Sequence, residues 1–247
     1  MEIFKKPAYL FGPFVGDLYW ETYRFAPHAL YLKKENPQTK LIVFTRQERF
    51  DLYGAYADIL VPLKLSKVDE DIQIGFTSKY VDDAYYQILG QYIHKKYSNN
   101  YNIINHLYPN ISAFFYKVKW QFPKDKMIFN FQPRRKNKLI VHKYLGNLQD
   151  IILTDCEDDY SDILKGYNII NINDFKTTII NDPECSFIGC MIELIKRSSL
   201  ILSDINSYLS KLSLLLRTRV ILTNDKVDHD YISLINPFKV KYFLIDK

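Results

Sequence analysis

The sequence predicts an α/β fold of two lobes, each built on a parallel sheet. Short apolar runs without polar alternation recur in both halves of the chain, as in strands that are covered on both faces. Segments with apolar residues at helical spacing separate these runs, so strands and helices alternate. Residues 131–138 (FQPRRKNK) combine a proline with four cations and are interpreted as the linker between the lobes.

The first lobe begins with three predicted strands, each an apolar run: residues 8–15, 40–45 and 57–63. A Gly16–Asp17 turn follows the first strand and leads into a helix. Pro27 breaks this helix and begins another, because proline is tolerated in the first turn of a helix but not in its interior. Strands and helices that alternate in this way are typical of a parallel sheet.

The clearest predicted helix spans residues 78–97. Ser78 can cap it, acidic residues occupy its first turn, and lysines occupy its last turn. One face carries five side chains that we expect to be buried: Val81, Tyr85, Ile88, Leu89 and Tyr92. The next stretch, residues 98–133, has no clear period and is interpreted as irregular, with one strand or short helix at 111–118.

The second lobe again alternates strands and helices. Its predicted strands are residues 139–142, 150–154, 167–172, 200–202, 220–222 and 242–245. Helices are expected at residues 161–166 and 187–197, with a loop over residues 173–183.

Residues 198–223 (SSLILSDINSYLSKLSLLLRTRVILT) predict strand, tight loop, helix and strand without a break. Ser203, Asp204, Asn206 and Ser207 supply turn formers and helix caps. So short a crossover joins parallel strands in the right-handed sense. Its loop lies at the carboxyl end of a strand and the amino end of a helix, where free N–H groups suit a phosphate. Many loops of this kind bind no ligand.

Three features of this region carry a family resemblance: residues 190–202 (CMIELIKRSSLIL), the pair Asn206–Ser207 with the leucine-rich helix, and residues 218–221 (TRVI). Together they resemble the donor half of GT-B glycosyltransferases of the heptosyltransferase type. That family has a Glu-Leu helix, a strand, Asp-Ser-Gly, a helix that begins near a His, and Gly-Thr-Pro. Asn206 and Ser207 stand at its Asp-Ser, and Lys211 stands at its His.

Other positions depart from the family pattern. Tyr208 replaces the Gly that follows Asp-Ser, and Arg217 and Arg219 replace the Gly and Pro of Gly-Thr-Pro. A Gly there lets the backbone approach a diphosphate closely, and Tyr removes that approach.

The resemblance implies two Rossmann-like lobes: an N-terminal acceptor domain over residues 1–133 and a C-terminal nucleotide-sugar donor domain over residues 134–247. It implies a substrate-binding role for Asn206, Ser207 and Lys211 toward the donor. By the same resemblance, Glu193 bonds the nucleotide ribose, and Lys143 or Arg135 neutralises the departing diphosphate in place of a metal. Alternatives are a polar helix position for Glu193 and a solvated charge for the cations.

Asp17 is the candidate catalytic base. Inverting sugar transfer needs a group within hydrogen-bond reach of the acceptor hydroxyl, and Asp17 follows the first strand, as the Gly-Asp of heptosyltransferases does. The alternative is a helix N-cap. Glu21, one turn later, is a weaker catalytic candidate, with a solvated helix position as its alternative. Arg46 ends the second strand and could clamp a phosphate or carboxylate, or form a surface ion pair.

The acidic run at residues 155–159 (DCEDD) follows a predicted strand and permits a metal-binding Asp-x-Asp of the GT-A type. We favour a solvated helix N-terminus for it. The five histidines are scattered without ligand spacing, so no metal site is expected.

The composition limits the classes of ligand and the cellular location that are expected for this protein. The net charge of +5 is compatible with anionic ligands but falls short of a dedicated nucleic-acid binder. Three cysteines without zinc-type spacing, together with the lack of a signal peptide or an apolar run of about 18 residues, predict a cytoplasmic protein without a membrane span. Heavy use of Asn, Ile, Lys and Tyr is typical of AT-rich genomes, such as those of viruses, phages and some bacteria.

The sequence therefore predicts a glycosyltransferase that moves a sugar from a nucleotide-sugar donor to an acceptor glycan or another hydroxyl-bearing substrate, without a metal or cofactor. Two alternatives stay open. One is an inactive glycosyltransferase-like module that binds or has a structural role. The other is a viral DNA-modifying glycosyltransferase, for which the basic residues at 134–138 should line the site and DNA binding should weaken with salt.

Overall fold

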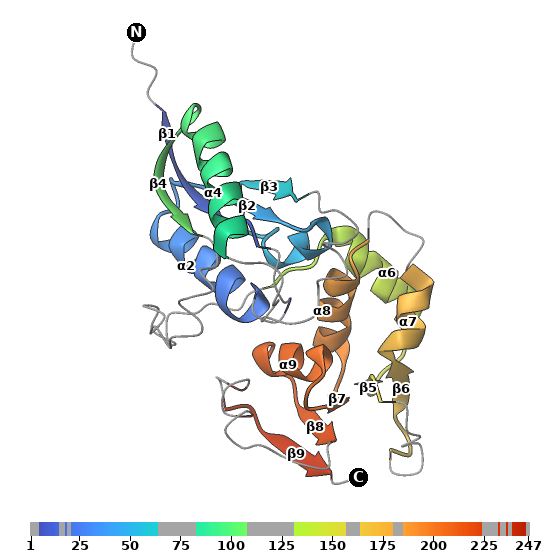
Figure 1. Cartoon of the computed structure of the whole chain (residues 1–247). Helices are drawn as coiled ribbons and strands as arrows, with labels where there is room; N and C mark the ends of the chain where they lie inside the picture. The colour runs from blue at the N-terminus through green and yellow to red at the C-terminus, as the bar shows by residue number, and fades with distance from the viewer. Residues whose placement is uncertain are drawn as a thin grey trace. The chain divides into compact units, whose positions relative to one another are not determined.

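The computed structural model describes residues 5–14, 18, 21–63, 83–107, 131–156, 164–179, 185–223, 232, 236 and 239–245. The chain divides into two compact units, Met1–Asn130 and Phe131–Lys247. Each unit holds one sheet whose paired strands are all parallel, with helices packed on it (Figure 1). The predicted α/β fold with two parallel sheets is confirmed.

Unit 1 contains a four-stranded sheet in the order β3-β2-β1-β4. Its strands are β1 (Lys6–Phe11), β2 (Lys40–Thr45), β3 (Ile59–Pro62) and β4 (Tyr101–Leu107). Its helices are the π-helix η1 (Glu21–Phe25), α2 (Ala26–Glu35), the 3-10 helix η2 (Gln47–Leu52) and α4 (Asp83–Ser98). Pro27 lies in the first turn of α2, as predicted.

Strand β4 corrects the expectation that residues 98–133 are irregular. It pairs with β1 at the edge of the sheet, where Tyr101 and Ile103 are half-buried while Asn102 and Asn105 are exposed. An edge strand needs only one apolar face, so the asparagines on its other face concealed it. The expected element at residues 111–118 lies outside the described residues.

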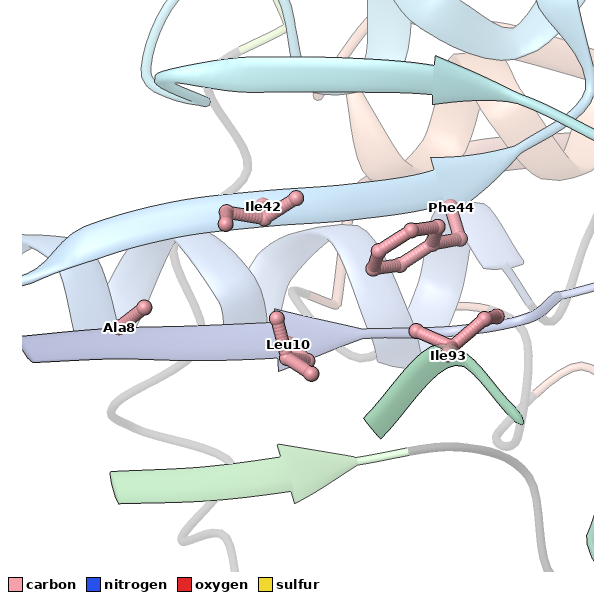
Figure 2. Packing of buried hydrophobic residues seen from close by; sticks show 5 residues of the cluster. All are labelled: Ala8, Leu10, Ile42, Phe44 and Ile93. Carbon is pink, nitrogen blue, oxygen red and sulfur yellow. The ribbon is translucent and has the colours of Figure 1, made fainter. Parts of the chain in front are cut away.

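The core of unit 1 packs alternate residues of β1 and β2 against helix α4. Figure 2 shows its five buried members, Ala8, Leu10, Ile42, Phe44 and Ile93. The face of α4 was predicted wrongly, because Ile88 is 70% exposed and Tyr92 is 62% exposed. The expectation for Leu89 is confirmed, because it packs on the cluster, and Tyr97, which was not predicted, packs there too. Apolar side chains occur on both sides of this helix, so periodicity alone does not choose the buried one.

Unit 2 contains a five-stranded sheet in the order β6-β5-β7-β8-β9. Its strands are β5 (Ile151–Thr154), β6 (Asn168–Asn171), β7 (Leu200–Asp204), β8 (Val220–Thr223) and β9 (Tyr242–Ile245). Its helices are α6 (Arg135–Leu145), α7 (Ile172–Ile179), α8 (Phe187–Arg197) and α9 (Tyr208–Leu215). The predicted run of strand, loop, helix and strand over residues 198–223 matches β7, α9 and β8.

Three predictions for unit 2 are wrong. The expected strand at 139–142 and the second half of the expected linker belong to helix α6, whose buried side chains recur four residues apart at Asn137, Val141 and Leu145. Helix α7 replaces most of the loop expected at 173–183. Of the helix expected at 161–166, only residues 164–166 are described, and they form a bend and a turn.

Candidate functional site

The carboxyl ends of β5, β7 and β8 meet at one edge of the unit 2 sheet, because these neighbouring strands are parallel. In α/β proteins this edge is where ligands usually bind. The last residues of two strands and the residues that follow them here are mostly polar: residues 154–156 at the end of β5 and residues 204–207 at the end of β7. They form the candidate site.

The loop after β7 is held by its own side chains. The backbone N–H of Asn206 donates to Asp204 Oδ1 over 2.7 Å. Ser207 is the N-cap of α9, and its Oγ accepts a 3.0 Å hydrogen bond from the N–H of Leu209. Asn206 is exposed, and Lys211 lies one turn into the helix. Three predicted site residues, Asn206, Ser207 and Lys211, therefore lie together at the amino end of α9.

A carboxylate joins this loop from the neighbouring strand. The hydroxyl of Ser207 donates to Oδ2 of Asp155, the first residue after β5. A carboxylate at a helix amino end is stabilised by the free N–H groups and the helix dipole. Sequence reasoning placed Asp155 in an acidic run and missed its pairing with Ser207. The available signal was its position directly after a buried strand.

Cys156 forms hydrogen bonds that connect the loop after β5 to the ends of the strands. Its N–H donates to Thr154 Oγ1 over 3.0 Å, and its carbonyl accepts a 3.1 Å hydrogen bond from Asn171 Nδ2 at the end of β6. Its sulfur lies 3.5 Å from Thr223 Oγ1 at the end of β8. These contacts fix the backbone on which Asp155 sits.

Metal ligands are not grouped at this edge. Within the described ranges, no three His, Cys, Asp or Glu side chains come together as a metal site would require. The remaining members of the acidic run, residues 157–159, lie outside the described residues.

Glu193 and Lys143 are not brought to this loop. Glu193 Oε1 accepts a 2.8 Å hydrogen bond from Arg197 Nε, and Arg197 Nη1 lies 3.5 Å from His142 Nδ1 of α6. Glu193 thus belongs to the contact between α6 and α8. The expectation that Lys143 follows a strand is wrong, because it occupies the last turn of α6, which leads to the amino end of β5. The candidate loop lies at the carboxyl ends.

In unit 1, Glu21 is fully buried in a polar cluster at the carboxyl end of β2. Its Oε1 accepts hydrogen bonds from Thr45 Oγ1 (2.5 Å) and Tyr53 OH (2.8 Å), and its Oε2 accepts one from Arg49 Nη1 (2.7 Å). Burial and the neighbouring Glu21 charge raise the pKa of Tyr53 well above its ordinary value. Both carboxylate oxygens of Glu21 accept hydrogen bonds, which suits a structural ion pair better than a catalytic base. The alternative prediction of a solvated helix position for Glu21 is wrong, because the side chain is buried.

Arg46 and Asp17 are the remaining predicted site residues. Arg46 immediately follows β2 and precedes η2, and only 3% of it is exposed, so the expected surface ion pair does not describe it. Asp17 lies outside the described residues.

A histidine pair near the carboxyl edge of the unit 1 sheet was not predicted. His106, on β4, lies with Nε2 2.7 Å from the carbonyl oxygen of Gly12, which follows β1. His94 of α4 stacks on it with ring centroids 5.8 Å apart. Burial lowers the pKa of His106, the Gly12 carbonyl opposes this, and the His94 charge adds to the lowering. The pair was missed because β4 was missed.

Comparison with solved structures addresses the fold. The crystal structure of a glycosyl transferase family 9 protein from Veillonella parvula matches with a TM-score of 0.57 and 9% identity, over 99% of this chain and 86% of that one. The chain has a GT-B glycosyltransferase fold. E. coli heptosyltransferase WaaC with ADP-2-deoxy-2-fluoro heptose matches with a TM-score of 0.47 and 11% identity, over 97% and 92%. No family model and no curated protein matches the sequence.

At these identities the likeness establishes the fold alone. The predicted viral or phage origin receives no support from the match to the Veillonella parvula protein. In the part of the chain that the structure describes, no helix is long and apolar enough to cross a membrane.

Proposed function

We propose that this protein is a glycosyltransferase that binds a nucleotide-sugar donor on unit 2 and transfers the sugar to a hydroxyl acceptor without a metal. One observation carries the proposal: the loop at residues 204–207 joins the carboxyl end of β7 to the amino end of α9 in a chain with a GT-B fold. In this role the exposed Asn206 amide and the N–H groups of α9 bind the donor diphosphate.

Asp17 remains the proposed base toward the acceptor. The buried ion pair between Glu21 and Arg49 disfavours Glu21 for this role, because a base must reach the acceptor hydroxyl. Lys211, one turn into α9, is the cation best placed along the chain to neutralise the donor, and it takes the role that the sequence assigned to Lys143.

Isothermal titration with a panel of UDP-, GDP- and ADP-sugars tests donor binding. We expect one member to bind the wild type and to bind Asn206→Ala about tenfold more weakly, as for the loss of one hydrogen bond to a charged group. Asn147→Ala is the matched control, since Asn147 is exposed in the turn after α6. Silence across the panel with the wild type would remove the donor proposal.

A second candidate, a binding or structural module that has lost the activity, is favoured by two observations. Tyr208 opens α9 where the resembled family has Gly, and the Asp155 carboxylate is hydrogen-bonded to the N-cap Ser207. A negative charge at that helix end competes with a diphosphate for the same N–H groups. An assay for released nucleoside diphosphate distinguishes the two candidates, with any nucleotide sugar that binds as the substrate. An enzyme releases nucleoside diphosphate when a suitable acceptor is present, or slowly when water accepts the sugar, and an inactive module does not.

A further inference from the structure

Helix α6 presents a basic outer face on unit 2. Its inner face buries Asn137, Val141 and Leu145, which pack it against α8 (Figure 1). Residues away from the inner face are exposed: Arg135, Leu139, His142 and Lys143 lie opposite it, and Lys138 lies on the flank nearest α8.

Cations outnumber carboxylates on helices α6 and α8. Helix α6 carries four Lys or Arg residues and no carboxylate, and the neighbouring α8 adds Lys196, Arg197 and the single carboxylate Glu193. Glu193 is already paired with Arg197. Burial lowers the pKa of Lys196, the Glu193 charge opposes this, and the nearby Lys138 charge adds to the lowering. Lys138 of α6 and Lys196 of α8 thus lie close enough for their charges to interact.

Apolar side chains are exposed among these cations. Leu139 is 56% exposed and lies one helical turn from both Arg135 and Lys143. Leu148, just beyond the helix, is 46% exposed, and Tyr144 is 38% exposed while its ring packs edge-on against Phe175. A polyphosphate backbone would satisfy the cations but would leave Leu139 and Leu148 in water. An interface with both anionic head groups and an apolar interior accommodates both kinds of side chain.

We propose that the outer face of α6 docks on an anionic lipid surface. Arg135, Lys138 and Lys143 contact the head groups, and Leu139 inserts between them at the level where the acyl chains begin. Because the helix keeps its inner face on α8, it lies along the surface and does not cross it. This interaction is independent of the proposed donor site, which lies at the carboxyl ends of the strands.

The expected strength follows from the charges. A Lys or Arg close to an anionic membrane improves partitioning about fivefold, so three such residues contribute on the order of 100-fold. Inserting one leucine adds about tenfold more. Screening by salt should remove most of the charge term, since the Debye length falls from about 10 Å at 0.1 M to about 3 Å at 1 M.

Vesicle co-sedimentation of the full chain tests the proposal. At 0.1 M NaCl we expect binding to vesicles of phosphatidylcholine with about 30% phosphatidylserine, weak binding to pure phosphatidylcholine, and loss at 1 M NaCl. The variant Arg135→Gln/Lys138→Gln/Lys143→Gln should bind about 100-fold more weakly. Its control, Arg219→Gln/Lys239→Gln/Lys241→Gln, removes equal charge from exposed residues around β8 and β9 and should bind as the wild type does.

Leu139→Ser separates a lipid surface from a nucleic acid. On vesicles it should weaken binding about tenfold without changing the salt dependence. Equal loss in the two triple variants, or equal binding to both vesicle types, would overturn the proposal. Preference for duplex DNA over anionic vesicles would also overturn it, if DNA binding is salt-sensitive and is unaffected by Leu139→Ser. That result would make the face a nucleic-acid surface.

Discussion

The two units use the carboxyl ends of their strands in different ways. In unit 1 the end of β2 is sealed by the fully buried Glu21, which bonds Thr45, Arg49 and Tyr53. In unit 2 the corresponding polar pair, Asp155 and Ser207, is only half-buried and adjoins an exposed asparagine. The buried ion pair at the first edge therefore stabilises the fold, whereas at the second edge the exposed Asn206 lies where a ligand can reach it.

Removing the buried carboxylate should give the largest difference between the units. Glu21→Ala removes the carboxylate that pairs with the buried, charged Arg49, which typically costs about 3–5 kcal/mol. Asp155→Ala should cost only about 1 kcal/mol, because it removes the hydrogen bond from Ser207 and with it Oδ1, a buried oxygen that accepts no hydrogen bond from the described residues. Urea unfolding followed by tryptophan fluorescence reports on unit 1, since Trp20 and Trp120 both lie in it. Far-UV circular dichroism reports on both units.

Glu35→Ala is the control for this comparison, because Glu35 is exposed at the end of α2. It should change the free energy of unfolding by less than about 0.5 kcal/mol. Similar costs for Glu21→Ala and Asp155→Ala would contradict the distinction between a sealed edge and an open one.

Two glycines allow the same comparison for backbone strain. Gly12 has φ +95°, and a Cβ there would lie 2.2 Å from the carbonyl oxygen of Phe44. Gly166 in unit 2 has φ +92°, but a Cβ there would meet nothing within 4 Å. Gly12→Ala should therefore cost about 3 kcal/mol, the sum of a steric clash and an unfavourable φ, and Gly166→Ala about 1 kcal/mol. Thermal unfolding of both variants measures the difference, and equal shifts would show that the Phe44 contact relaxes.

Acid should weaken unit 1 through His28. This side chain is 4% exposed beneath Phe11, and burial lowers its pKa from 6.5 to about 3. The unfolded chain takes up the proton below pH 6.5 while the folded chain does not, so stability falls as pH falls. The loss between pH 6.5 and pH 5 should be about 2 kcal/mol.

His28→Phe should remove the His28 part of this loss, because phenylalanine fills the site without titrating, and should leave the part due to His106, whose pKa is also lowered by burial. Urea midpoints of unit 1 at pH 7, 6 and 5 provide the measurement. His142→Phe is the control, because His142 is exposed and lies in unit 2, so the urea midpoints of unit 1 should not change. A wild-type midpoint that does not fall with pH would show that His28 is protonated in the folded state.

Much of unit 2 was predictable because local pattern and tertiary burial agree there. The helix at residues 187–197 and the run at 198–223 show apolar periodicity that matches their buried faces. Helix α6 was not predictable in this way. Its buried face includes the polar Asn137, whose Oδ1 accepts from Ser186 N at 3.1 Å, while Leu139 is exposed. Ser186 lies 49 residues from Asn137 along the chain, so the sequence around Asn137 does not indicate this hydrogen bond.

The candidate site was predictable only in part, for a topological reason. The loop with Asn206 and Ser207 is contiguous in sequence, so its chemistry could be inferred from one segment. The Asp155–Ser207 contact requires β5 to lie beside β7, although β6 comes between them along the chain. Strand order in a parallel sheet depends on which helices cover which face, and chain order does not reveal it.

The smallest predicted effect concerns Arg217, which stands where the resembled family has Gly. Its φ is 62°, its N–H donates to Leu214 O over 3.2 Å, and the Thr218 N–H donates to Ser213 O over 2.9 Å. This is the Schellman end of α9, which favours Gly because other residues are strained at positive φ. Position 217 thus carries an arginine side chain, although its backbone has the left-handed conformation that favours glycine.

Arg217→Gly should therefore be more stable than Arg217→Ala by about 1 kcal/mol. Both variants lose the arginine side chain and its contacts, so their difference isolates the backbone term in unit 2. Differential scanning calorimetry of the two variants measures it as a higher Tm for the glycine. Gly146→Ala, at φ 55° and ψ −123° beside the end of α6, should also lose stability relative to the wild type, because this conformation favours glycine. If alanine and glycine at position 217 melt together, the helix end relaxes to a negative φ, and α9 is held by the burial of Leu212, Leu214 and Leu215 rather than by its cap.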